Sequence, residues 1–277
     1  RIEISKSGLL SRDTMLQTAL VDMYAKCGMI EKSKEIFDEL PIRSVVSWNA
    51  LISGYINQGL ANEALKCFAQ MCDEGLSPDQ VTYVCILKAC GLAQSLSLGE
   101  EIHAEIKKQN LLEKNVILGN ALVDMYVKCS MLEKAQEVLN KLPRRNVISW
   151  STLIAGYAQH GLGDKAINCW RKMKDEGLLP NALTFIFILK ACGSIGSREI
   201  GEEIHMQVSK QGLLKKDIML ATTLLDMYVK FSMLGKAQQV FDDIPIRDVV
   251  SWNALIAGYT QHGLSDEALE CFRNMQR

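Results

Sequence analysis

Hydrogen-bonding side chains recur at one position of a repeating sequence pattern, where they could recognise the polar edges of a ligand. The position lies one turn into an expected helix. Its occupants are Thr18, Asn49, Val84, Asn120, Ser151, Ile186, Thr222 and Asn253. Most of them are Asn, Ser or Thr, which suit a helix interior poorly because they compete for nearby backbone groups. The flanking sequence repeats closely whereas this position varies, which indicates ligand recognition.

A second polar position closes each segment of the pattern. Its occupants are Ser44, Asp79, Asn115, Asn146, Asn181, Asp217 and Asp248. Each stands directly before an expected helix, as does Asp13, and Ser, Asp and Asn are preferred caps of a helix N-terminus. Capping alone explains the residue types, but it does not explain why Asp, Asn and Ser alternate. A capping role and a recognition role both stay open.

Nine cysteines and one His-x-Glu pair raise the question of metal binding or catalysis. No Cys-x-x-Cys pair occurs, and Cys27 and Cys129 correspond to Phe231, so reduced thiols are expected. Buried positions are expected for Cys67, Cys90, Cys169, Cys192 and Cys271. His103-Ala104-Glu105 is similar to the His-x-Glu of zinc deaminases, but its counterpart is His205-Met206-Gln207. We predict no catalytic residue, no metal site and no cofactor.

Three lysines form a series with a spacing of 102 residues: Lys26, Lys128 and Lys230. Each is expected at the C-terminal end of a helix, where a cation complements the helix dipole. Contact with phosphate groups is the functional alternative. It predicts that changing one lysine lowers affinity about equally for all nucleic-acid sequences.

The elements that position these side chains follow from an internal repeat. The segments around Trp48, Trp150 and Trp252 match one another at the same spacing of 102 residues, which indicates an array of supersecondary units. The five prolines obey this spacing and mark the ends of segments. Repeats of 35, 36 and 31 residues result. They cover 14–44, 45–79, 80–115, 116–146, 147–181, 182–217 and 218–248, with a partial repeat at 1–13 and a truncated one at 249–277.

Each repeat is expected to form two amphipathic helices, because apolar residues recur at three- and four-residue spacings around a Gly or Ser turn. In repeat 147–181 the first helix is expected from Val147 to Gln159, with a break near Gly161. The second helix should bury Ala166, Ile167, Trp170 and Met173. One helix pair cannot bury its own apolar face, so the pairs must stack. The predicted fold is all-α: a single array over 1–277 that forms a right-handed α-solenoid of stacked helix-turn-helix repeats.

The composition limits the classes of function. An apolar content of 48% is ample for a helical core, and no apolar run is long enough to span a bilayer, so no membrane association is expected. A net charge of −1 gives no overall basic footprint for nucleic acid. No signal or transit segment is visible, and both ends of the sequence fall inside repeats, as expected for a fragment of a longer protein.

With these features, the chain resembles the pentatricopeptide repeat proteins of plant organelles whose repeats alternate in length. The phrases that carry the resemblance are Leu122-Val123-Asp124-Met125-Tyr126, Trp252-Asn253-Ala254-Leu255-Ile256 and Lys190-Ala191-Cys192-Gly193. The resemblance covers essentially the whole chain. It implies that the repeats of 35, 36 and 31 residues are the P, L and S types of that family, with the end of an L repeat at 1–13 and a truncated P repeat at 249–277.

The resemblance also implies that each repeat reads about one RNA base with two or three side chains. The two polar positions are then the base-reading pair. The pairs of the L repeats should read poorly: Val84 with Asn115, and Ile186 with Asp217. Apolar residues three before each first reading residue are expected to sandwich the bases, with core packing as the alternative. They are Met15, Val46, Val81, Ile117, Ile148, Leu183, Met219 and Val250.

The residue types of each pair predict a base. Ser or Thr leaves room for a purine, whereas the larger Asn suits a pyrimidine. An ionised Asp only accepts hydrogen bonds and suits the ring N–H of uracil or guanine, whereas Asn can donate to cytosine or adenine. The predicted RNA is 5′-purine-U-n-C-A-n-G-pyrimidine-3′. The pairs that read it are Thr18/Ser44, Asn49/Asp79, Asn120/Asn146, Ser151/Asn181 and Thr222/Asp248, followed by Asn253.

The expected function is sequence-specific binding of single-stranded RNA, with no enzymatic activity in this segment. The resemblance implies a chloroplast or mitochondrial location and a role as the targeting segment of a C-to-U RNA-editing or RNA-processing factor. Editing-complex proteins are expected as further partners, and a deaminase domain could lie beyond the segment or act as a partner. The alternative function is a peptide-binding scaffold like the tetratricopeptide repeat proteins, without RNA specificity.

Overall fold

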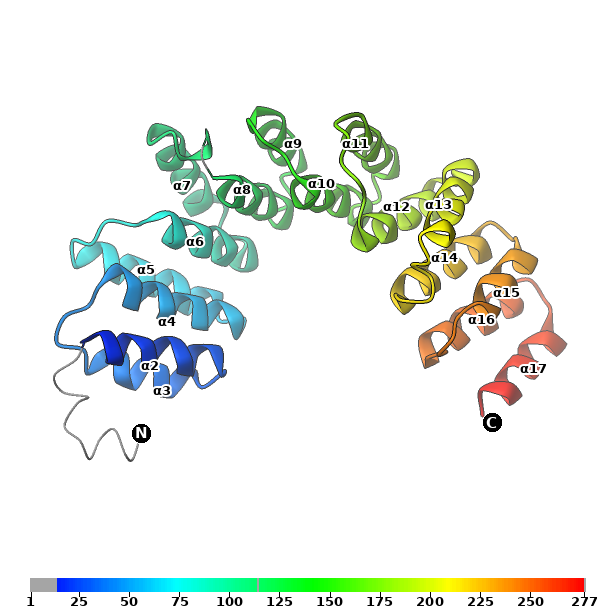
Figure 1. Cartoon of the computed structure of the whole chain (residues 1–277), viewed down its shortest axis with the longest axis horizontal. Coiled ribbons are helices and arrows are strands. Elements are labelled where there is room, and N and C mark those ends of the chain that lie inside the picture. Colours follow the sequence, from blue (N-terminus) through cyan, green and yellow to red (C-terminus); the bar gives the residue numbers. More distant parts are fainter. Residues whose placement is uncertain (1–13, 114, 277) are drawn as a thin grey trace. The chain divides into compact units, whose positions relative to one another are not determined.

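A computed structural model describes residues 14–113 and 115–276, and the regular elements in these ranges are all helices. The all-α prediction is confirmed. The expected partial repeat 1–13, including Asp13, lies outside the described residues. The chain divides into two compact halves, Arg1–Arg145 and Asn146–Arg277, called here the N-terminal and C-terminal halves. Figure 1 shows successive helical hairpins within each of them.

In the N-terminal half, the helices alternate between two layers. The first helices of the hairpins are α2 (Thr14–Lys26), α4 (Val45–Asn57), α6 (Gln80–Ala93) and α8 (Val116–Lys128). The second helices are α3 (Ile30–Asp38), α5 (Ala61–Asp73), α7 (Leu96–Lys108) and α9 (Leu132–Lys141), with a short 3-10 helix η1 (Leu111–Glu113) after α7. Each first helix packs on the next first helix, so that these helices form one continuous layer.

The C-terminal half repeats this arrangement. Its first helices are α10 (Val147–Gln159), α12 (Ala182–Ile195), α14 (Ile218–Lys230) and α16 (Val249–Gln261). Its second helices are α11 (Gly163–Asp175), α13 (Arg198–Lys210), α15 (Leu234–Asp242) and α17 (Ser265–Met275). The expected break near Gly161 is confirmed, because Gly161 has a φ of +72° between α10 and α11. The four side chains predicted to be buried on α11 are all in the core.

Polar caps determine where the first helices begin. The side chain of each closing residue accepts a hydrogen bond from the backbone N–H three residues later, at 2.8–3.3 Å. The capping prediction is confirmed for Ser44, Asp79, Asn115, Asn146, Asn181, Asp217 and Asp248. Replacing such a cap by alanine typically costs about 0.5–2 kcal/mol. These caps stabilise the helices that carry the candidate recognition residues.

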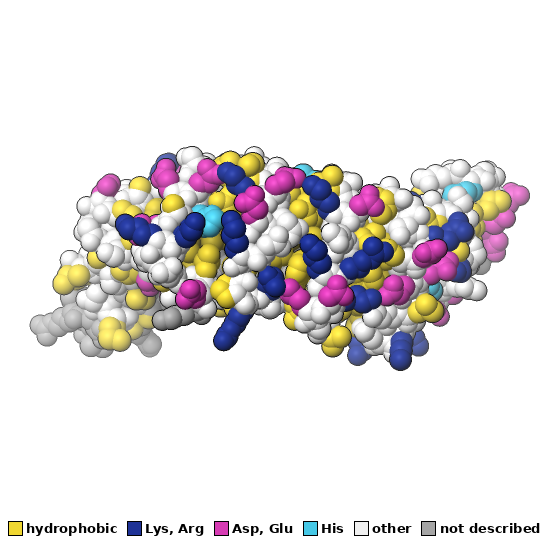
Figure 2. Space-filling view, turned by 90° about the horizontal axis from the view of Figure 1, so that it is seen from above, with side chains coloured by type: hydrophobic (Ala, Val, Ile, Leu, Met, Phe, Trp, Pro, Cys, Tyr) yellow, Lys and Arg dark blue, Asp and Glu magenta, His cyan; other side chains and the backbone are white. Residues whose placement is uncertain are grey.

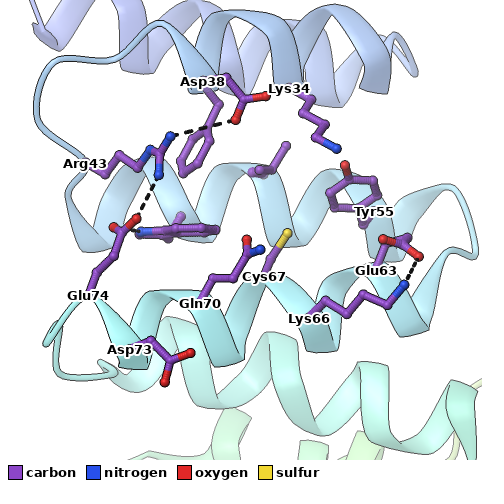
Figure 3. A pocket seen from close by; sticks show the side chains of 13 residues that line it. Lys34, Asp38, Arg43, Tyr55, Glu63, Lys66, Cys67, Gln70, Asp73 and Glu74 are labelled. Atoms are coloured by element: carbon purple, nitrogen blue, oxygen red, sulfur yellow. Dashed lines mark hydrogen bonds and ion pairs between the residues drawn. The ribbon is translucent and has the colours of Figure 1, made fainter.

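A cluster of side chains around Trp48, which we call the tryptophan clasp, joins three consecutive helices of the N-terminal half. The buried indole donates from Nε1 to Glu74 Oε2 at 3.1 Å, just after α5. Arg43 donates to the other carboxylate oxygen of Glu74 at 2.7 Å and stacks over the rings of Trp48 and of Phe37 on α3. Figure 3 shows Arg43 between Asp38 and Glu74. The clasp therefore ties α3 and the end of α5 to the start of α4.

Candidate nucleic-acid interface

The apolar residues expected to sandwich bases are exposed. Each is the second residue of a first helix, and the exposed fractions of these residues run from 55% at Leu183 to 83% at Met15. The others are Val46, Val81, Ile117, Ile148, Met219 and Val250. The core-packing alternative is therefore wrong for this set. Each first helix therefore exposes an apolar side chain near its N-terminus.

The predicted first reading residues lie one turn further along the same helices and are more enclosed. Asn49 is 8% exposed, Ser151 is 9% exposed and Ile186 is 2% exposed. Thr18, Val84, Asn120 and Thr222 are half-buried, and Asn253 on α16 is exposed. A buried polar side chain needs a hydrogen-bond partner. Those partners decide which of the predicted pairs the structure brings together.

In repeat 45–79 the two predicted reading residues touch directly. Asn49 donates from Nδ2 to Asp79 Oδ1 at 3.1 Å. Thr82, at the start of α6, donates from Oγ1 to Asn49 Oδ1 at 2.8 Å. Burial alone would raise the pKa of Asp79, but hydrogen bonds from Thr82 and Asn49 bring that pKa below its usual value. Asp79 is thus a carboxylate that only accepts hydrogen bonds at neutral pH.

In repeat 147–181 a hydroxyl links the predicted pair. Ser151 Oγ lies 2.7 Å from Thr184 Oγ1, and Thr184 Oγ1 donates to Asn181 Oδ1 at 2.8 Å. Thr184 occupies the same position in α12 that Thr82 occupies in α6. Both predicted pairs of the 35-residue repeats are therefore assembled, each with a threonine from the following repeat.

The pairs of the 31-residue repeats are arranged differently. Thr18 Oγ1 donates to the backbone oxygen of Thr14 at 2.8 Å, and Ser44 is engaged in its own helix cap. Thr222 Oγ1 is buried and has no hydrogen-bond partner in the described parts of the chain. Its predicted partner Asp248 caps α16. Asn120 lies on α8 of the N-terminal half, whereas Asn146 begins the C-terminal half.

The 36-residue repeats carry apolar side chains at the first reading position. Val84 is half-buried and Ile186 is in the core, so neither offers a hydrogen bond. Asn115 donates from Nδ2 to Gln80 Oε1 at 2.7 Å and also caps α8. Asp217 caps α14. At the first position of the pair, these repeats lack a side chain that could hydrogen-bond to a base edge.

A groove of about 790 Å³ in the N-terminal half gathers the predicted residues of three successive repeats. Its lining includes Met15, Thr18, Ser44, Val46, Asn49, Asp79 and Val81. Apolar side chains and hydrogen-bonding groups therefore line one groove together. That combination suits planar rings with polar edges, which is the chemistry of nucleobases.

The three lysines of the 102-residue series end α2, α8 and α14 as predicted. Each pairs with an aspartate four residues earlier: Lys26 with Asp22 at 2.6 Å, Lys128 with Asp124 at 2.8 Å and Lys230 with Asp226 at 2.8 Å. The lysine side chains remain 40–71% exposed. Exposed ion pairs of this kind are weak, so each ammonium group stays accessible to a phosphate.

The histidines and cysteines have structural surroundings. His103 Nδ1 lies 2.8 Å from the hydroxyl of Tyr126, and His205 Nδ1 lies 2.7 Å from that of Tyr228. The described cysteines are all free, and burial raises the pKa of Cys67 to about 11 and that of Cys90 to about 12. Burial is confirmed for Cys67, Cys90, Cys169 and Cys192, but Cys271 is only half-buried. It lies on α17, the last described helix.

A second hollow, of about 480 Å³, lies among α3, α4 and α5 and contains the tryptophan clasp (Figure 3). Its polar walls hold structural ion pairs, namely Arg43 with Glu74 and Lys66 with Glu63. None of the predicted reading or sandwiching residues lines it. We therefore place the candidate interface on the first helices.

Charge is mixed over the surface drawn in Figure 2, where Lys and Arg side chains alternate with Asp and Glu side chains and hydrophobic atoms show between them. This agrees with the net charge of −1. Among the described helices, none combines the length and apolarity needed to cross a membrane.

The sequence interpretation missed Thr82, Thr184 and the clasp. A signal for the threonines was present, because a Ser or Thr follows three residues after five closing residues, whereas Leu118 and Leu220 follow the other two. A signal for the clasp was also present. Trp48 and Glu74 have the same separation as Trp150 and Glu176, and Trp150 also donates to Glu176, at 2.8 Å.

Comparisons with known proteins give concordant results. The family model described as "PPR repeat family" matches residues 43–91 and 145–194. A second model, described as "PPR repeat", matches residues 18–45, 120–147, 221–249 and 250–277. The chain is 38% identical to the putative pentatricopeptide repeat-containing protein At3g13770, mitochondrial, of Arabidopsis thaliana, over 95% of this chain and 42% of that protein. It is 37% identical to the chloroplastic relative At4g18520 of the same plant, over 97% of this chain and 43% of that protein.

Solved structures show the same fold. The crystal structure of the pentatricopeptide repeat protein PPR10 in complex with an 18-nucleotide psaJ RNA element superposes with a TM-score of 0.79 and 21% identity, over 99% of this chain and 41% of that one. The structure of PPR10 from maize gives the same TM-score at 19% identity, over 95% of this chain and 38% of that one. The chain spans less than half the length of the curated relatives and solved structures that it matches here.

Proposed function

The chain belongs to the pentatricopeptide repeat family, and from this we propose that it binds single-stranded RNA and reads about one base per repeat. The observation that carries the proposal is the row of exposed apolar side chains on the first helices, each one turn before a reading residue. Apolar packing of bases against such side chains would supply affinity, and hydrogen bonds to base edges would supply specificity. A structure with an RNA element bound to PPR10, which has the same fold, supports this choice of ligand.

The geometry of the assembled pairs supports the predicted bases. Asp79 is held as a carboxylate beside Asn49, as reading of uracil requires. Asn181 already accepts hydrogen bonds at Oδ1 from the backbone N–H and the hydroxyl of Thr184. Its amide N–H groups are then the part of the side chain that a base can use, and adenine presents a bare ring nitrogen to such a donor. Ile186 and Val84 offer no hydrogen bond, which supports weak reading by the 36-residue repeats.

The proposed target is 5′-purine-U-n-C-A-n-G-pyrimidine-3′, and the proposed role is that of an addressing segment. Relatives named as mitochondrial and chloroplastic support a location in one of these organelles. We propose that the full protein directs C-to-U editing or other processing of an organelle transcript. Any deaminase chemistry would then come from another part of the protein or from a partner in the editing complex.

The test is direct binding at physiological salt to a labelled RNA of the predicted sequence and to a second RNA with its C and A exchanged. Mismatched positions in sequence-specific complexes cost about 1–3 kcal/mol each, so we expect at least about tenfold weaker binding of the exchanged RNA. Equal binding would contradict base-by-base reading. Absence of binding to either RNA would favour the peptide-binding scaffold instead.

A further inference from the structure

We infer that Thr82 and Thr184 are positioning residues of the base-reading sites in the two complete 35-residue repeats, although each belongs to the following repeat. The inference rests on the proposed function and adds a third side chain to two reading pairs. Each threonine is the third residue of its helix, and both side chains are fully buried. Neither threonine is expected to touch RNA, so each would act through the pair beside it.

In repeat 45–79 the threonine fixes the orientation of an amide. The Thr82 hydroxyl lies 2.8 Å from Asn49 Oδ1 and 2.9 Å from Asp79 Oδ1, and it has one proton to donate. Asp79 Oδ1 already accepts from the Thr82 backbone N–H and from the Asn49 amide at 3.1 Å, so we assign the hydroxyl proton to the carbonyl oxygen of Asn49. A turn of the amide by half a rotation would place oxygen against oxygen. Without the hydroxyl, a largely buried amide oxygen would lose a partner and the side chain would be freer to turn. The hydroxyl therefore stabilises the one orientation that presents a defined edge to the base.

In repeat 147–181 the threonine sets the direction of two hydrogen bonds. Its hydroxyl has a single proton and donates it to Asn181 Oδ1. Ser151, at 2.7 Å, must then donate its own proton to Thr184 Oγ1. Ser151 is left with lone pairs for a base, and Asn181 is left with N–H groups. An acceptor beside a donor matches the amino group and the bare ring nitrogen of adenine, and it does not match guanine.

Other repeats show that a hydroxyl at this position does not always reach the reading residue. Ser47 donates to the backbone oxygen of Ser44, and Ser251 donates to that of Asp248, each at 2.8 Å. Leu118 and Leu220 follow the poorly reading 36-residue repeats and have no hydroxyl. Thr82 and Thr184 accept capping bonds from the backbone N–H of Asp79 and Asn181, and they also contact the reading side chain, which Ser47 and Ser251 do not. The serines supply controls for the experiment.

The experiment compares RNAs with A or G at the position read by Ser151 and Asn181. The wild-type chain should prefer A by about tenfold. Thr184→Val should bring this ratio to within about twofold of one, whereas Thr184→Ser, which keeps the hydroxyl, should preserve it. As the control, Ser251→Ala removes a hydroxyl at the same helix position that bonds only to the backbone oxygen of Asp248, and it should leave the preference of repeat 218–248 for G over A unchanged. The thermal unfolding temperature of each variant measures any loss of helix stability separately from the change in base preference.

The outcomes distinguish the inference from the proposed function. If the wild-type chain prefers A and Thr184→Val keeps that ratio while binding both RNAs more weakly, Thr184 is only a cap and the inference is wrong. If Thr184→Ser loses the preference for A over G as Thr184→Val does, the hydroxyl is not the cause of that preference and the inference is also wrong. If the wild-type chain binds A and G equally, the proposed function itself fails at this repeat.

Discussion

Thr18 and Thr222, at the proposed first reading position of two 31-residue repeats, differ in which hydrogen bonds their hydroxyls make. The Thr18 hydroxyl donates to the backbone of its own helix, whereas Thr222 Oγ1 is buried without a partner in the described residues. Leaving a buried hydroxyl unsatisfied costs about 1–3 kcal/mol. A base edge that satisfies Thr222 would recover this free energy on binding. Repeat 218–248 should therefore contribute more to recognition than repeat 14–44.

We predict that Thr222→Asn changes the preferred base of repeat 218–248 from G to U. The larger amide takes the room of a purine, while Asp248 still selects a ring N–H. Binding is measured with four RNAs that differ only at this position. We expect the affinity for the G RNA to fall about tenfold and the affinity for the U RNA to rise about tenfold. In the same variant, the preference for A at the position of repeat 147–181 serves as the control and should not change. Retention of G as the preferred base would contradict the assignment of Thr222.

At the scale of elements, the helices were predictable because their signals are local. The expected first helix Val147–Gln159 coincides with α10, and apolar spacing identified the buried face of α11. Exposure of Met15 and its counterparts was not predictable, because an apolar residue at a helix start can face a neighbouring helix or the solvent. Which one it faces depends on how the hairpins stack. The bond between Thr82 and Asn49 likewise joins residues of two repeats, and only the packing of α6 on α4 creates it.

The tryptophan clasp gives a prediction about how helices are joined. We expect Glu74→Ala to lower the free energy of unfolding by about 1–3 kcal/mol, because the buried Trp48 indole N–H loses its acceptor. Glu74→Gln keeps an oxygen for the indole and loses only a partly exposed ion pair with Arg43, so it should cost less than about 1 kcal/mol. Urea unfolding measures both, and hydrogen exchange of the α4 amides locates the effect. Equal costs for the two variants would show that the indole hydrogen bond is unimportant.

The contact between α7 and α8 and that between α13 and α14 should be sensitive to acid. Burial lowers the pKa of His103 below the ordinary value of 6.5, helped by Lys107 and Lys141 and opposed by Glu100. Burial likewise lowers the pKa of His205, with Lys236 acting in the same direction. A lowered folded-state pKa means that the unfolded chain binds protons first as the pH falls. The stabilisation by neutral histidine is thus complete above pH 6.5 and is lost progressively below it.

We therefore expect the urea midpoint of the wild-type chain to fall between pH 7.5 and pH 5.5. The double variant His103→Gln and His205→Gln should show a smaller fall, because glutamine can still bond to Tyr126 and Tyr228 but does not titrate. The carboxylate of Asp79, whose pKa is lowered, stays ionised throughout this range and does not contribute. Identical pH dependence in the two proteins would exclude the histidines as the cause.

At the scale of the whole molecule, the charge distribution limits how RNA can be held. The net charge of −1, together with the mixed charges on the face drawn in Figure 2, leaves little general attraction for phosphates. Affinity should come mainly from stacking and base contacts, with three lysines as the expected phosphate contacts. For single strands the slope of log affinity against log salt is about −0.7 per neutralised phosphate, which gives about −2 for three contacts.

We predict that Lys128→Gln weakens binding to all RNA sequences by a similar factor and makes the salt slope shallower by about 0.7. The discrimination between bases should stay the same. Lys66→Gln is the matched control, because it removes the same charge from an exposed ion pair on the second helix α5. A change of base preference in Lys128→Gln, or an equal loss of affinity in both variants, would contradict phosphate contact by Lys128.

The closing residues cap the following helices, and this restricts how the protein can change its target during evolution. If these residues also read bases, substitutions among Ser, Asn and Asp alter the selected base while the next helix still has a good cap. An apolar substitution at Asp79 or Asn181 would instead weaken both recognition and the adjacent helix. Stable folding thus restricts these positions to the few residue types that cap a helix well. Substitutions among these residue types can therefore change the RNA target of the protein in evolution without an unstable intermediate.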